Sequence, residues 1–374
     1  MAILPNGVRV RLTALLTGLV LLTAGVPGTA HAGTPHPRFL LTAGTASQGI
    51  SVLRVHDDGA LTPVPGSPFA TGLGVLSLVV SPDGEKVYVP HALDGGVSGY
   101  RISASGRLTP IPGADVKVGG APTAARLTPD GKYLYVVLGG VPGRVTSYRV
   151  TGSGALIATG KPTAPVDGFS MVGMGGIDPS GTRMRVVSYI GNTMTNYALG
   201  PGGGIRRLGV TRVGLGPVAP GYSPDGRFLY VSDEFSLGLS GFRIGDDGSV
   251  TPTPGSPYPT GGVPHGIVMT PDGKRLYVPN AVGTSIAAYN AHADGRLTPI
   301  AGSPYPGPAG TLPGQVLLHP NGRYLYDIDV LTARLTSRVT TYRIGADGSL
   351  SRTSRPEVDT GVVMSDGPIA AMTP

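Results

Sequence analysis

The chain has 374 residues, and its 29 lysines and arginines exceed its 22 aspartates and glutamates, which gives a formal net charge of +7. It contains no cysteine, and this excludes disulfide bonds and lipid attachment to cysteine. The basic residues are scattered, and the densest pair, Arg206-Arg207, has no interleaved aromatic residues, so the composition argues against a nucleic-acid-binding surface.

The first 32 residues have the three features of a secretory signal peptide. Arg9 and Arg11 precede an apolar run over residues 12–26, and Ala30-His31-Ala32 has the form of a cleavage site. The alternative, a membrane anchor, needs about 20 apolar residues, which is more than this run supplies. We therefore expect export, cleavage after Ala32, and a soluble, secreted domain over residues 33–374.

Internal repeats dominate the rest of the sequence. A Pro-Asp-Gly type turn recurs at intervals of 47, 50, 45, 47 and 49 residues, at Pro82, Pro129, Pro179, Pro224, Pro271 and Pro320. A further 54 residues lead to Pro374, the last residue. A short apolar run precedes each turn, and runs of aromatic and β-branched residues bounded by Gly and Pro follow it, which indicates strands. Four predicted strands in about 47 residues match the length of a propeller blade.

The two ends of the chain complete one repeat between them. Sequences typical of the second, third and fourth strands of a unit occur at Arg38–Leu41, Ile50–Val55 and Leu61–Val64, but no first strand precedes them. The segment Ile369–Pro374 supplies it. Six whole units and this split unit predict an all-β, seven-bladed propeller with four antiparallel strands per blade. The C-terminal strand closes it by pairing with the N-terminal strands, which leaves no long sheet edge open.

These repeats resemble those of a known family. The segments Ser223–Asp233 (SPDGRFLYVSD), Val263–Asn280 and Gly295–Tyr305 are similar to segments of the seven-bladed lactonase-type propellers. That group includes 6-phosphogluconolactonase-like proteins, carboxymuconate-cyclising enzymes and Tyr-Val-Thr-Asn (YVTN) repeat proteins. The resemblance covers the whole of residues 33–374, and it implies lactone chemistry at the mouth of the central channel. Its motifs mostly form turns and blade contacts, so they specify the fold more closely than the chemistry.

The predicted functional face lies opposite the Pro-Asp-Gly turns, where variable loops surround the channel. The chain should reach the channel mouth six residues before each turn proline, at Leu76, Thr123, Gly173, Val218, His265, Gly314 and Pro368. In lactonase-like relatives several of these positions hold His, Arg or Ser. Here only His265 keeps that character, so the chain departs from the family's pattern.

A second predicted ring lies at the ends of the second strands, at Gly44, His91, Leu138, Tyr189, Asp233, Asn280 and Asp329. Because Asp233 and Asn280 belong to consecutive blades and His265 opens the blade of Asn280, we expect these three to form the catalytic group. His265 would be the general base, Asp233 would orient it, and Asn280 would donate to the developing negative charge. The candidate substrate-binding residues are Glu234, Asp329, His91, Tyr189 and Arg126. The alternative is that these side chains cap loops and bond exposed backbone.

The sequence contains no recognisable metal or nucleotide motif, and we expect no cofactor. One alternative is a divalent cation such as calcium, held by the carboxylate and amide oxygens of Asp233, Glu234, Asn280 and Asp329. Arg126 lies inside a predicted first strand, where it would hold an anionic substrate or form a structural ion pair.

Two classes of function follow. The first is an exported lactonase-like hydrolase, or a related lactone-forming cyclase, that acts on a small carbonyl substrate at the channel mouth. The second is a non-catalytic propeller that binds an extracellular protein or glycan through its loops. In both cases we expect a monomer that neither binds nucleic acid nor inserts into a membrane.

Overall fold

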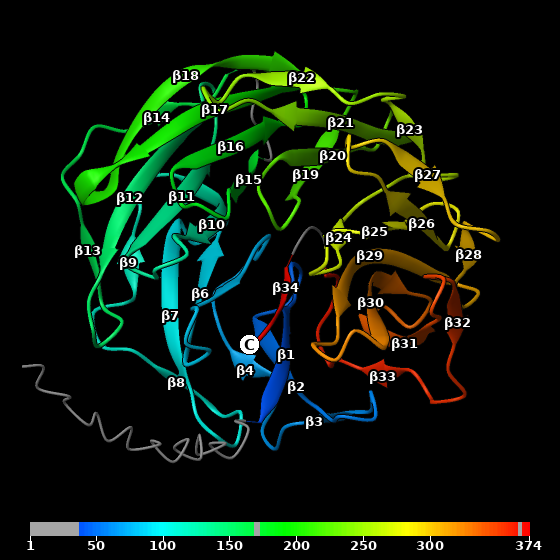
Figure 1. The fold of residues 1–374 in the computed structure, drawn as a ribbon. Helices are drawn as coiled ribbons and strands as arrows, with labels where there is room; N and C mark the ends of the chain where they lie inside the picture. The colour runs from blue at the N-terminus through cyan, green and yellow to red at the C-terminus, as the bar shows by residue number, and fades with distance from the viewer. Residues whose placement is uncertain (1–36, 168–172, 366–368) are drawn as a thin grey trace, which may run out of the picture. The chain divides into compact units, whose positions relative to one another are not determined.

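The computed structural model describes residues 37–167, 173–365 and 369–374, and the predicted signal peptide and its cleavage site lie outside these ranges. Seven antiparallel sheets are arranged around an axis, and the seven-bladed propeller predicted from the repeats is confirmed (Figure 1). The described residues include one short 3-10 turn, η1 (Pro201–Gly203), and no helix long and apolar enough to cross a membrane.

The strands of the first three blades follow one another from the innermost outward. Blade 1 contains β34 (Ala370–Met372), β1 (Arg38–Ala43), β2 (Gly49–Val55) and β3 (Leu61–Pro63), with β4 (Phe69–Ala70) also paired to β2. Blade 2 contains β5 (Val79–Val80), β6 (Lys86–His91), β7 (Gly96–Ile102) and β8 (Leu108–Pro110), with β9 (Val116–Lys117) paired to β7. Blade 3 contains β10 (Ala121–Leu127), β11 (Tyr133–Gly139), β12 (Arg144–Val150) and β13 (Leu156–Ala158), with β14 (Ala164–Pro165) paired to β12.

The other four blades have the same order. Blade 4 contains β15 (Gly173–Ile177), β16 (Arg183–Ser188), β17 (Thr193–Gly200) and β18 (Gly204–Arg212). Blade 5 contains β19 (Pro217–Tyr222), β20 (Phe228–Asp233), β21 (Gly238–Ile244) and β22 (Val250–Pro252), with β23 (Tyr258–Pro259) paired to β21. Blade 6 contains β24 (Val268–Met269), β25 (Arg275–Asn280), β26 (Ser285–Ala291) and β27 (Leu297–Pro299), with β28 (Tyr305–Pro306) paired to β26. Blade 7 contains β29 (Thr311–Leu318), β30 (Tyr324–Thr332), β31 (Arg338–Ile344) and β32 (Leu350–Arg352), with β33 (Val358–Asp359) paired to β31.

The outer edge of most blades differs from the single fourth strand predicted from the sequence. In every blade except blade 4, two short strands pair with the third strand, one near each end. Each of these outer segments contains proline, which has no N–H to donate to a ladder and therefore interrupts the strand. The outer segment of blade 4 has no proline, and its nine-residue strand β18 pairs with β17 from Thr193↔Arg212 to Gly200↔Gly204. Proline-broken edges also resist pairing with another chain.

The predicted closure of the ring is confirmed. Strand β34 pairs antiparallel with β1, with Leu41 opposite Ala371, and the two lie side by side in Figure 1. The Phe39 N–H donates to the Thr373 hydroxyl over 2.9 Å. On its other side, β34 is held by the Gln315 side chain of blade 7. Its Oε1 accepts from the Ala370 N–H over 2.7 Å, and its Nε2 donates to the Ala370 carbonyl over 3.0 Å. Both edges of the last strand are therefore engaged.

A repeated hydrogen bond joins six of the seven blades to the blade that follows; blade 1 has Leu40 at the donor position. The third residue of the second strand is tyrosine in five blades, and its buried hydroxyl donates to a glycine carbonyl in the following blade's outer hairpin. The donor–acceptor pairs are Tyr88–Gly154, Tyr135–Gly204, Tyr230–Gly295, Tyr277–Gly348 and Tyr326–Gly59, at 2.8 to 3.4 Å. In blade 4, Arg185 takes this position and its Nη2 donates to the Gly248 carbonyl. We call this contact the interblade bond.

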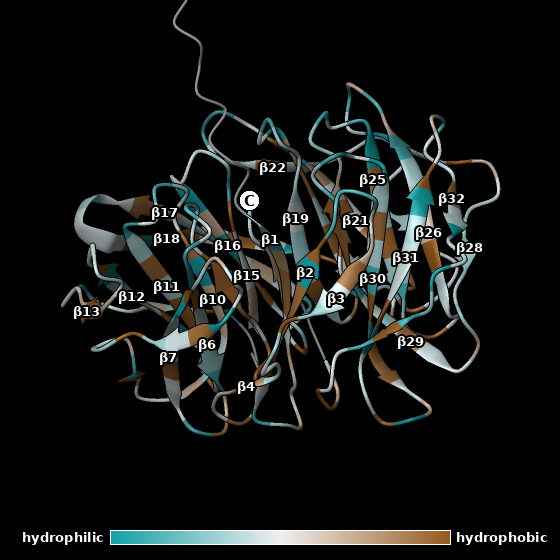
Figure 2. Cartoon of the chain, turned by 90° about the horizontal axis from the view of Figure 1, so that it is seen from below, coloured by the Kyte–Doolittle hydropathy of each residue, from teal (hydrophilic) through white to brown (hydrophobic). Residues whose placement is uncertain are grey.

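The core lies between the blades. One buried cluster joins Phe228 and Tyr230 of blade 5 to Leu276 and Val278 of blade 6. Hydrophobic and hydrophilic residues alternate along many strands (Figure 2), and the two faces of a sheet both pack against neighbouring sheets. Side chains on the two faces of a second strand therefore point toward two different blades.

Removing residues 369–374 tests the closure. We expect the unfolding free energy to fall by about 3 kcal/mol or more, because buried Ile369 and the β34 ladder are both lost. The melting temperature, measured by circular dichroism, should fall by roughly 5 °C or more. A protein that starts at Gly33 and keeps its C-terminus is the reference. Equal melting temperatures for the two proteins would contradict the closing role of β34.

Candidate functional site

Three side chains from consecutive blades meet at the loop face. The Nε2 atom of His265, which precedes β24, lies 3.2 Å from Oε1 of Glu234 in the β20–β21 hairpin. The other carboxylate oxygen, Oε2, accepts a 2.6 Å hydrogen bond from the hydroxyl of Tyr189 in the β16–β17 hairpin. The His265 and Glu234 side chains are only 7% and 14% exposed, so their interaction is largely shielded from water. We call Tyr189, Glu234 and His265 the three-blade site.

Strand alternation explains why Glu234 reaches His265. Successive side chains of a strand point to opposite faces, so Tyr230, Ser232 and Glu234 share the face that packs against blade 6. Tyr230 makes the interblade bond to Gly295, and the Ser232 hydroxyl donates to the His265 carbonyl over 2.5 Å. Glu234 is the next alternate residue along the chain, so its side chain also points toward blade 6.

The backbone around His265 is held by its own blade and by both neighbouring blades, since the Ser232 hydroxyl of blade 5 also bonds the His265 carbonyl. The His265 N–H donates to the Pro279 carbonyl over 3.0 Å, and the Gly266 N–H donates to the Gly314 carbonyl over 3.0 Å. The bond from Gly266 enters blade 7, so the loop is anchored to blades on both sides. The imidazole is therefore positioned by backbone contacts rather than by a flexible loop.

The expected pairing of Asp233 with His265 is wrong. Asp233 lies on the opposite face of β20, where its Oδ2 accepts hydrogen bonds from the Ser240 N–H at 3.0 Å and the Ser240 hydroxyl at 2.6 Å. Burial raises the pKa of Asp233 to about 6, against the opposing effect of the Ser240 hydrogen bonds. Glu234, expected to bind substrate, is the carboxylate that contacts the imidazole.

The side chains of Asn280 and His91 contact the segments that lead into their blades from the preceding ones. The Asn280 Nδ2 donates to the Thr260 carbonyl at 2.9 Å and to the Ser285 hydroxyl at 3.1 Å. The His91 Nε2 lies 3.1 Å from the Thr71 hydroxyl, and burial lowers the pKa of this histidine. Asn280 is near His265 along the backbone, but its amide does not turn toward the imidazole. For these two residues the contacts match the loop-capping alternative.

The predicted ring of second-strand ends is one residue out of register in blade 4. Strand β16 ends at Ser188, so Ser188 corresponds to Asp233 and Tyr189 corresponds to Glu234. Tyr189 therefore points toward blade 5 for the same reason that Glu234 points toward blade 6. Counting alternate residues from the interblade position, Arg185 in blade 4 and Tyr230 in blade 5, finds both side chains from the sequence.

Asp329 belongs to a buried acidic pair that the sequence analysis missed. Asp327 and Asp329 are two residues apart on one face of β30. Neither carboxylate oxygen of Asp327 has a hydrogen-bond partner among the described residues, and the Thr311 hydroxyl lies near the Asp329 carboxyl group. Burial and the Asp329 charge raise the pKa of Asp327 well above its ordinary value, and burial raises the pKa of Asp329 to about 7. The sequence does contain a signal for Asp327: it is a charged residue at the fourth position of a second strand, where blades 5 and 6 have Val231 and Val278.

Arg126 lies on β10, three residues beyond the channel-mouth position at Thr123 and thus about 10 Å further along the strand. Its Nη1 donates to the Ser77 hydroxyl at 2.8 Å and to the Ala125 carbonyl at 2.7 Å. Burial lowers the pKa of this guanidinium to about 10. Both partners are neutral, so these contacts do not include the structural ion pair that was the alternative role for Arg126.

The four oxygen ligands suggested for a divalent cation do not converge. Asp233 bonds Ser240, Glu234 contacts His265 and Tyr189, and Asn280 bonds Thr260 and Ser285, while Asp329 pairs with Asp327 in blade 7. The part of the chain that the structure describes contains no group of three or more His, Cys, Asp or Glu side chains placed to hold a metal ion.

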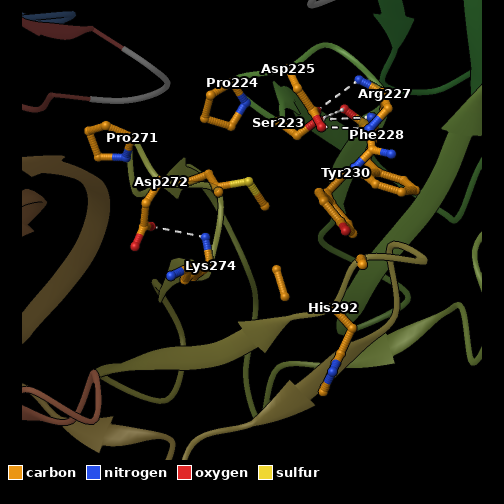
Figure 3. Close-up of a pocket in the computed structure, with 14 residues that line it drawn as sticks. Ser223, Pro224, Asp225, Arg227, Phe228, Tyr230, Pro271, Asp272, Lys274 and His292 are labelled. Atoms are coloured by element: carbon orange, nitrogen blue, oxygen red, sulfur yellow. Dashed lines mark hydrogen bonds and ion pairs between the residues drawn. The ribbon is translucent and has the colours of Figure 1, made fainter.

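A large pocket lies away from the three-blade site, on the face of the Pro-Asp-Gly turns. It has a volume of about 540 Å³ between blades 5 and 6, and its lining includes Asp225, Arg227, Asp272 and His292 (Figure 3). A second pocket, between blades 3 and 4, uses equivalent turn positions such as Pro129 and Asp130. Because the same hollow recurs between different blades, we attribute it to the geometry of blade packing.

The model of the family described as "Lactonase, 7-bladed beta-propeller" matches residues 31–364. A putative 6-phosphogluconolactonase from Bacteroides fragilis has 20% sequence identity and a TM-score of 0.75, over 92% of this chain and 99% of the other. The periplasmic gluconolactonase PpgL of Pseudomonas aeruginosa has 20% identity and a TM-score of 0.73, over 90% and 99%. No curated protein sequence matches the chain significantly. Similarity at this level of identity bears on the fold alone.

The buried acidic pair predicts an unusual dependence of stability on pH. An aspartate titrates near pH 3.9 in an unfolded chain, and the pKa of Asp329 is about 7 when folded. The folded protein therefore binds more protons in this window, and the unfolding free energy falls as pH rises from about 4 through about 7. Replacing both residues in the double variant Asp327→Asn/Asp329→Asn should flatten this fall and make the variant more stable than the parent at pH 8.

Urea unfolding between pH 4 and pH 8 measures the effect. The raised pKa of Asp233 also makes the unfolding free energy fall as pH rises. Because Asp233 is present in both proteins, the difference between the two curves reports the contribution of Asp327 and Asp329. Asp272→Asn is the control. Its hydrogen bond from Thr270 lowers the pKa of Asp272, so its contribution changes below the window. Parallel curves for parent and double variant would contradict the assignment.

Proposed function

The chain belongs to the lactonase family of seven-bladed β-propellers, and from this premise we propose that it is a hydrolase that opens a small lactone at the loop face. The observation that carries the proposal is the 3.2 Å contact of His265 with Glu234, reinforced by the Tyr189 hydroxyl. A histidine whose imidazole is held by a carboxylate is a common arrangement for general base catalysis.

The proposed reaction requires one water molecule and no other reactant. The His265–Glu234 pair accepts a proton from water as the water oxygen bonds to the lactone carbonyl carbon. The ester bond to the ring oxygen then breaks, and the proton passes to that oxygen to give the hydroxy acid. Glu234 stabilises the imidazolium formed in between, because the two groups are close and shielded from solvent. The reverse sequence of steps closes a lactone, so the same site accommodates the cyclase alternative.

Tyr189 and Asn280 have different parts in this proposal. Tyr189 is a positioning residue, since its hydrogen bond orients the carboxylate that holds the imidazole. Asn280 is left out of the catalytic group, because its amide already donates to Thr260 and Ser285. The site is partly closed, and a lactone would approach from the loop side, where Tyr189 is partly exposed.

Export is a second part of the proposal. Residues 1–32 combine arginines, an apolar run and an Ala-x-Ala end, and the described fold begins at Arg38, shortly after the expected cleavage point. Mass spectrometry of protein recovered from the culture medium should find Gly33 at or near the N-terminus. A cell-associated product that retains residues 1–32 would contradict both export and cleavage.

The alternative function, a non-catalytic binding module, is favoured by one observation. The hairpins between second and third strands expose large apolar side chains in several blades, including Leu93, Val141 and Val282. Exposed apolar side chains that gather on one face of a protein often mark a surface for another protein. A lack of activity toward a broad lactone panel, with and without added calcium, would support this alternative.

The proposed chemistry predicts that His265→Gln and Glu234→Gln each lower the rate of lactone opening. We expect a loss of about 10²-fold for His265→Gln, the usual scale for removing a general base. The double variant should lose little more than His265→Gln alone, because the two residues act as one unit. Hydrolysis is followed by the acid released at constant pH.

His292→Gln is the matched control. His292 lies on the opposite face, in the pocket of Figure 3, and its Nε2 contacts the Thr298 hydroxyl at 2.8 Å. Full activity in His265→Gln would refute the site, and a loss in His292→Gln would move attention to the turn face.

A further inference from the structure

The loops around the three-blade site expose four large apolar side chains. Ile190, Leu215, Phe235 and Leu237 are each half or more exposed, and Phe235 reaches 66%. All four lie in the loops of blades 4 and 5 that carry or adjoin Tyr189 and Glu234. We call these four residues the apolar wall. The β20–β21 hairpin exposes two of them, Phe235 and Leu237, whereas the corresponding hairpins of blades 2, 3, 6 and 7 expose one large apolar side chain each.

Direct contacts join the apolar wall to the three-blade site. The rings of Phe235 and Tyr189 lie 5.5 Å apart at an interplanar angle of 59°, an arrangement favourable for aromatic pairs. The Phe235 N–H donates to the Leu215 carbonyl at 3.0 Å, and the Leu237 N–H donates to the Glu234 carbonyl at 3.3 Å. The wall is therefore continuous with the polar groups and held by backbone hydrogen bonds.

A glycine allows Phe235 to lie close against the neighbouring loop. Gly216 has a φ of +65°, and a Cβ atom there would lie 2.7 Å from the Phe235 ring. Any larger residue at this position would displace the ring and also be strained. The exposed ring is thus seated on the loop that carries Leu215, and it does not project freely into solvent.

The charge around the site disfavours a phosphorylated substrate. Proteins bind phosphate mainly through arginine, lysine and helix N-termini. The segments 189–192, 213–216, 234–237 and 262–266 contain no lysine or arginine, and Glu234 adds a negative charge at their centre. A sugar phosphate would meet repulsion from Glu234 and no nearby cationic side chain from these segments.

From these contacts we infer that the site selects lactones that carry an aliphatic or aromatic substituent over sugar lactones and their phosphates. The lactone ring would lie against His265 and Glu234, and its substituent would cover Phe235 and its apolar neighbours. This inference rests on the proposed function for the ring-opening step. The binding of the substituent depends only on the apolar wall.

The test compares γ-lactones without a side chain, with a butyl side chain and with an octyl side chain, alongside glucono-δ-lactone. Transfer of a methylene group out of water strengthens binding by about 4-fold, so kcat/KM should rise steeply with chain length, mainly through a lower KM. Phe235→Ser should reduce the ratio of octyl to unsubstituted kcat/KM by about 10-fold or more. Leu93→Ser, at the equivalent hairpin position of blade 2, is the control and should keep the ratio.

Calorimetric binding of an octyl-substituted γ-lactam separates the wall from the chemistry, because a lactam resists hydrolysis. If the lactam binds and Phe235→Ser weakens that binding, the apolar wall is a ligand site. If no lactone is opened at the same time, the proposed hydrolase is rejected. Lactone opening with a preference for glucono-δ-lactone would retain the hydrolase and overturn this inference. The inference is also overturned if Phe235→Ser and Leu93→Ser change the octyl ratio equally, or if the lactam does not bind.

Discussion

The interblade bond is the interaction on which the arrangement of the described fold depends. A tyrosine hydroxyl buried between two sheets must find an acceptor, because an unpaired polar group in such a place costs about 1–3 kcal/mol. The glycine carbonyl of the next blade is the acceptor in five blades, and in the ring-closing case it joins Tyr326 to Gly59. A Cβ at Gly59 would lie 2.7 Å from the Tyr324 ring, so glycine is required for this approach. Where it forms, the bond fixes a second strand against the outer hairpin of the next blade.

That attachment decides which loop residues meet. Once Tyr230 is fixed to Gly295, alternation along β20 carries Ser232 to the His265 carbonyl and Glu234 to the imidazole. The opposite face of the same strand carries Asp233, whose carboxylate bonds Ser240 of the adjacent strand β21. Two adjacent carboxylates therefore have unrelated roles. One joins two blades at the loop face, and the other binds Ser240 and stabilises a hairpin.

Blade 4, which carries Tyr189 of the three-blade site, is also the least regular. Blade 4 has arginine in place of the interblade tyrosine, and Arg185 bonds Asn196 and Tyr222 as well as Gly248. Its outer edge is one continuous strand, whereas proline divides the outer edge of the other blades. Blade 5 exposes Phe235 beside Tyr189 of blade 4. The hollows on the turn face, by contrast, recur between blades because the turns that line them are repeated.

The sequence by itself determined the number of blades, the split first blade and the positions of the turns, because each of these depends on local signals repeated along the chain. Aromatic and β-branched runs between Gly and Pro turns have the same meaning in every copy. It also brought His265 to the loop face, since that required only counting from Pro271. Only the tertiary structure decided that Glu234 rather than Asp233 contacts His265, and that Asp327 is buried beside Asp329. These contacts depend on which face of a strand meets the next blade, and that is set by packing between sheets rather than by any single repeat.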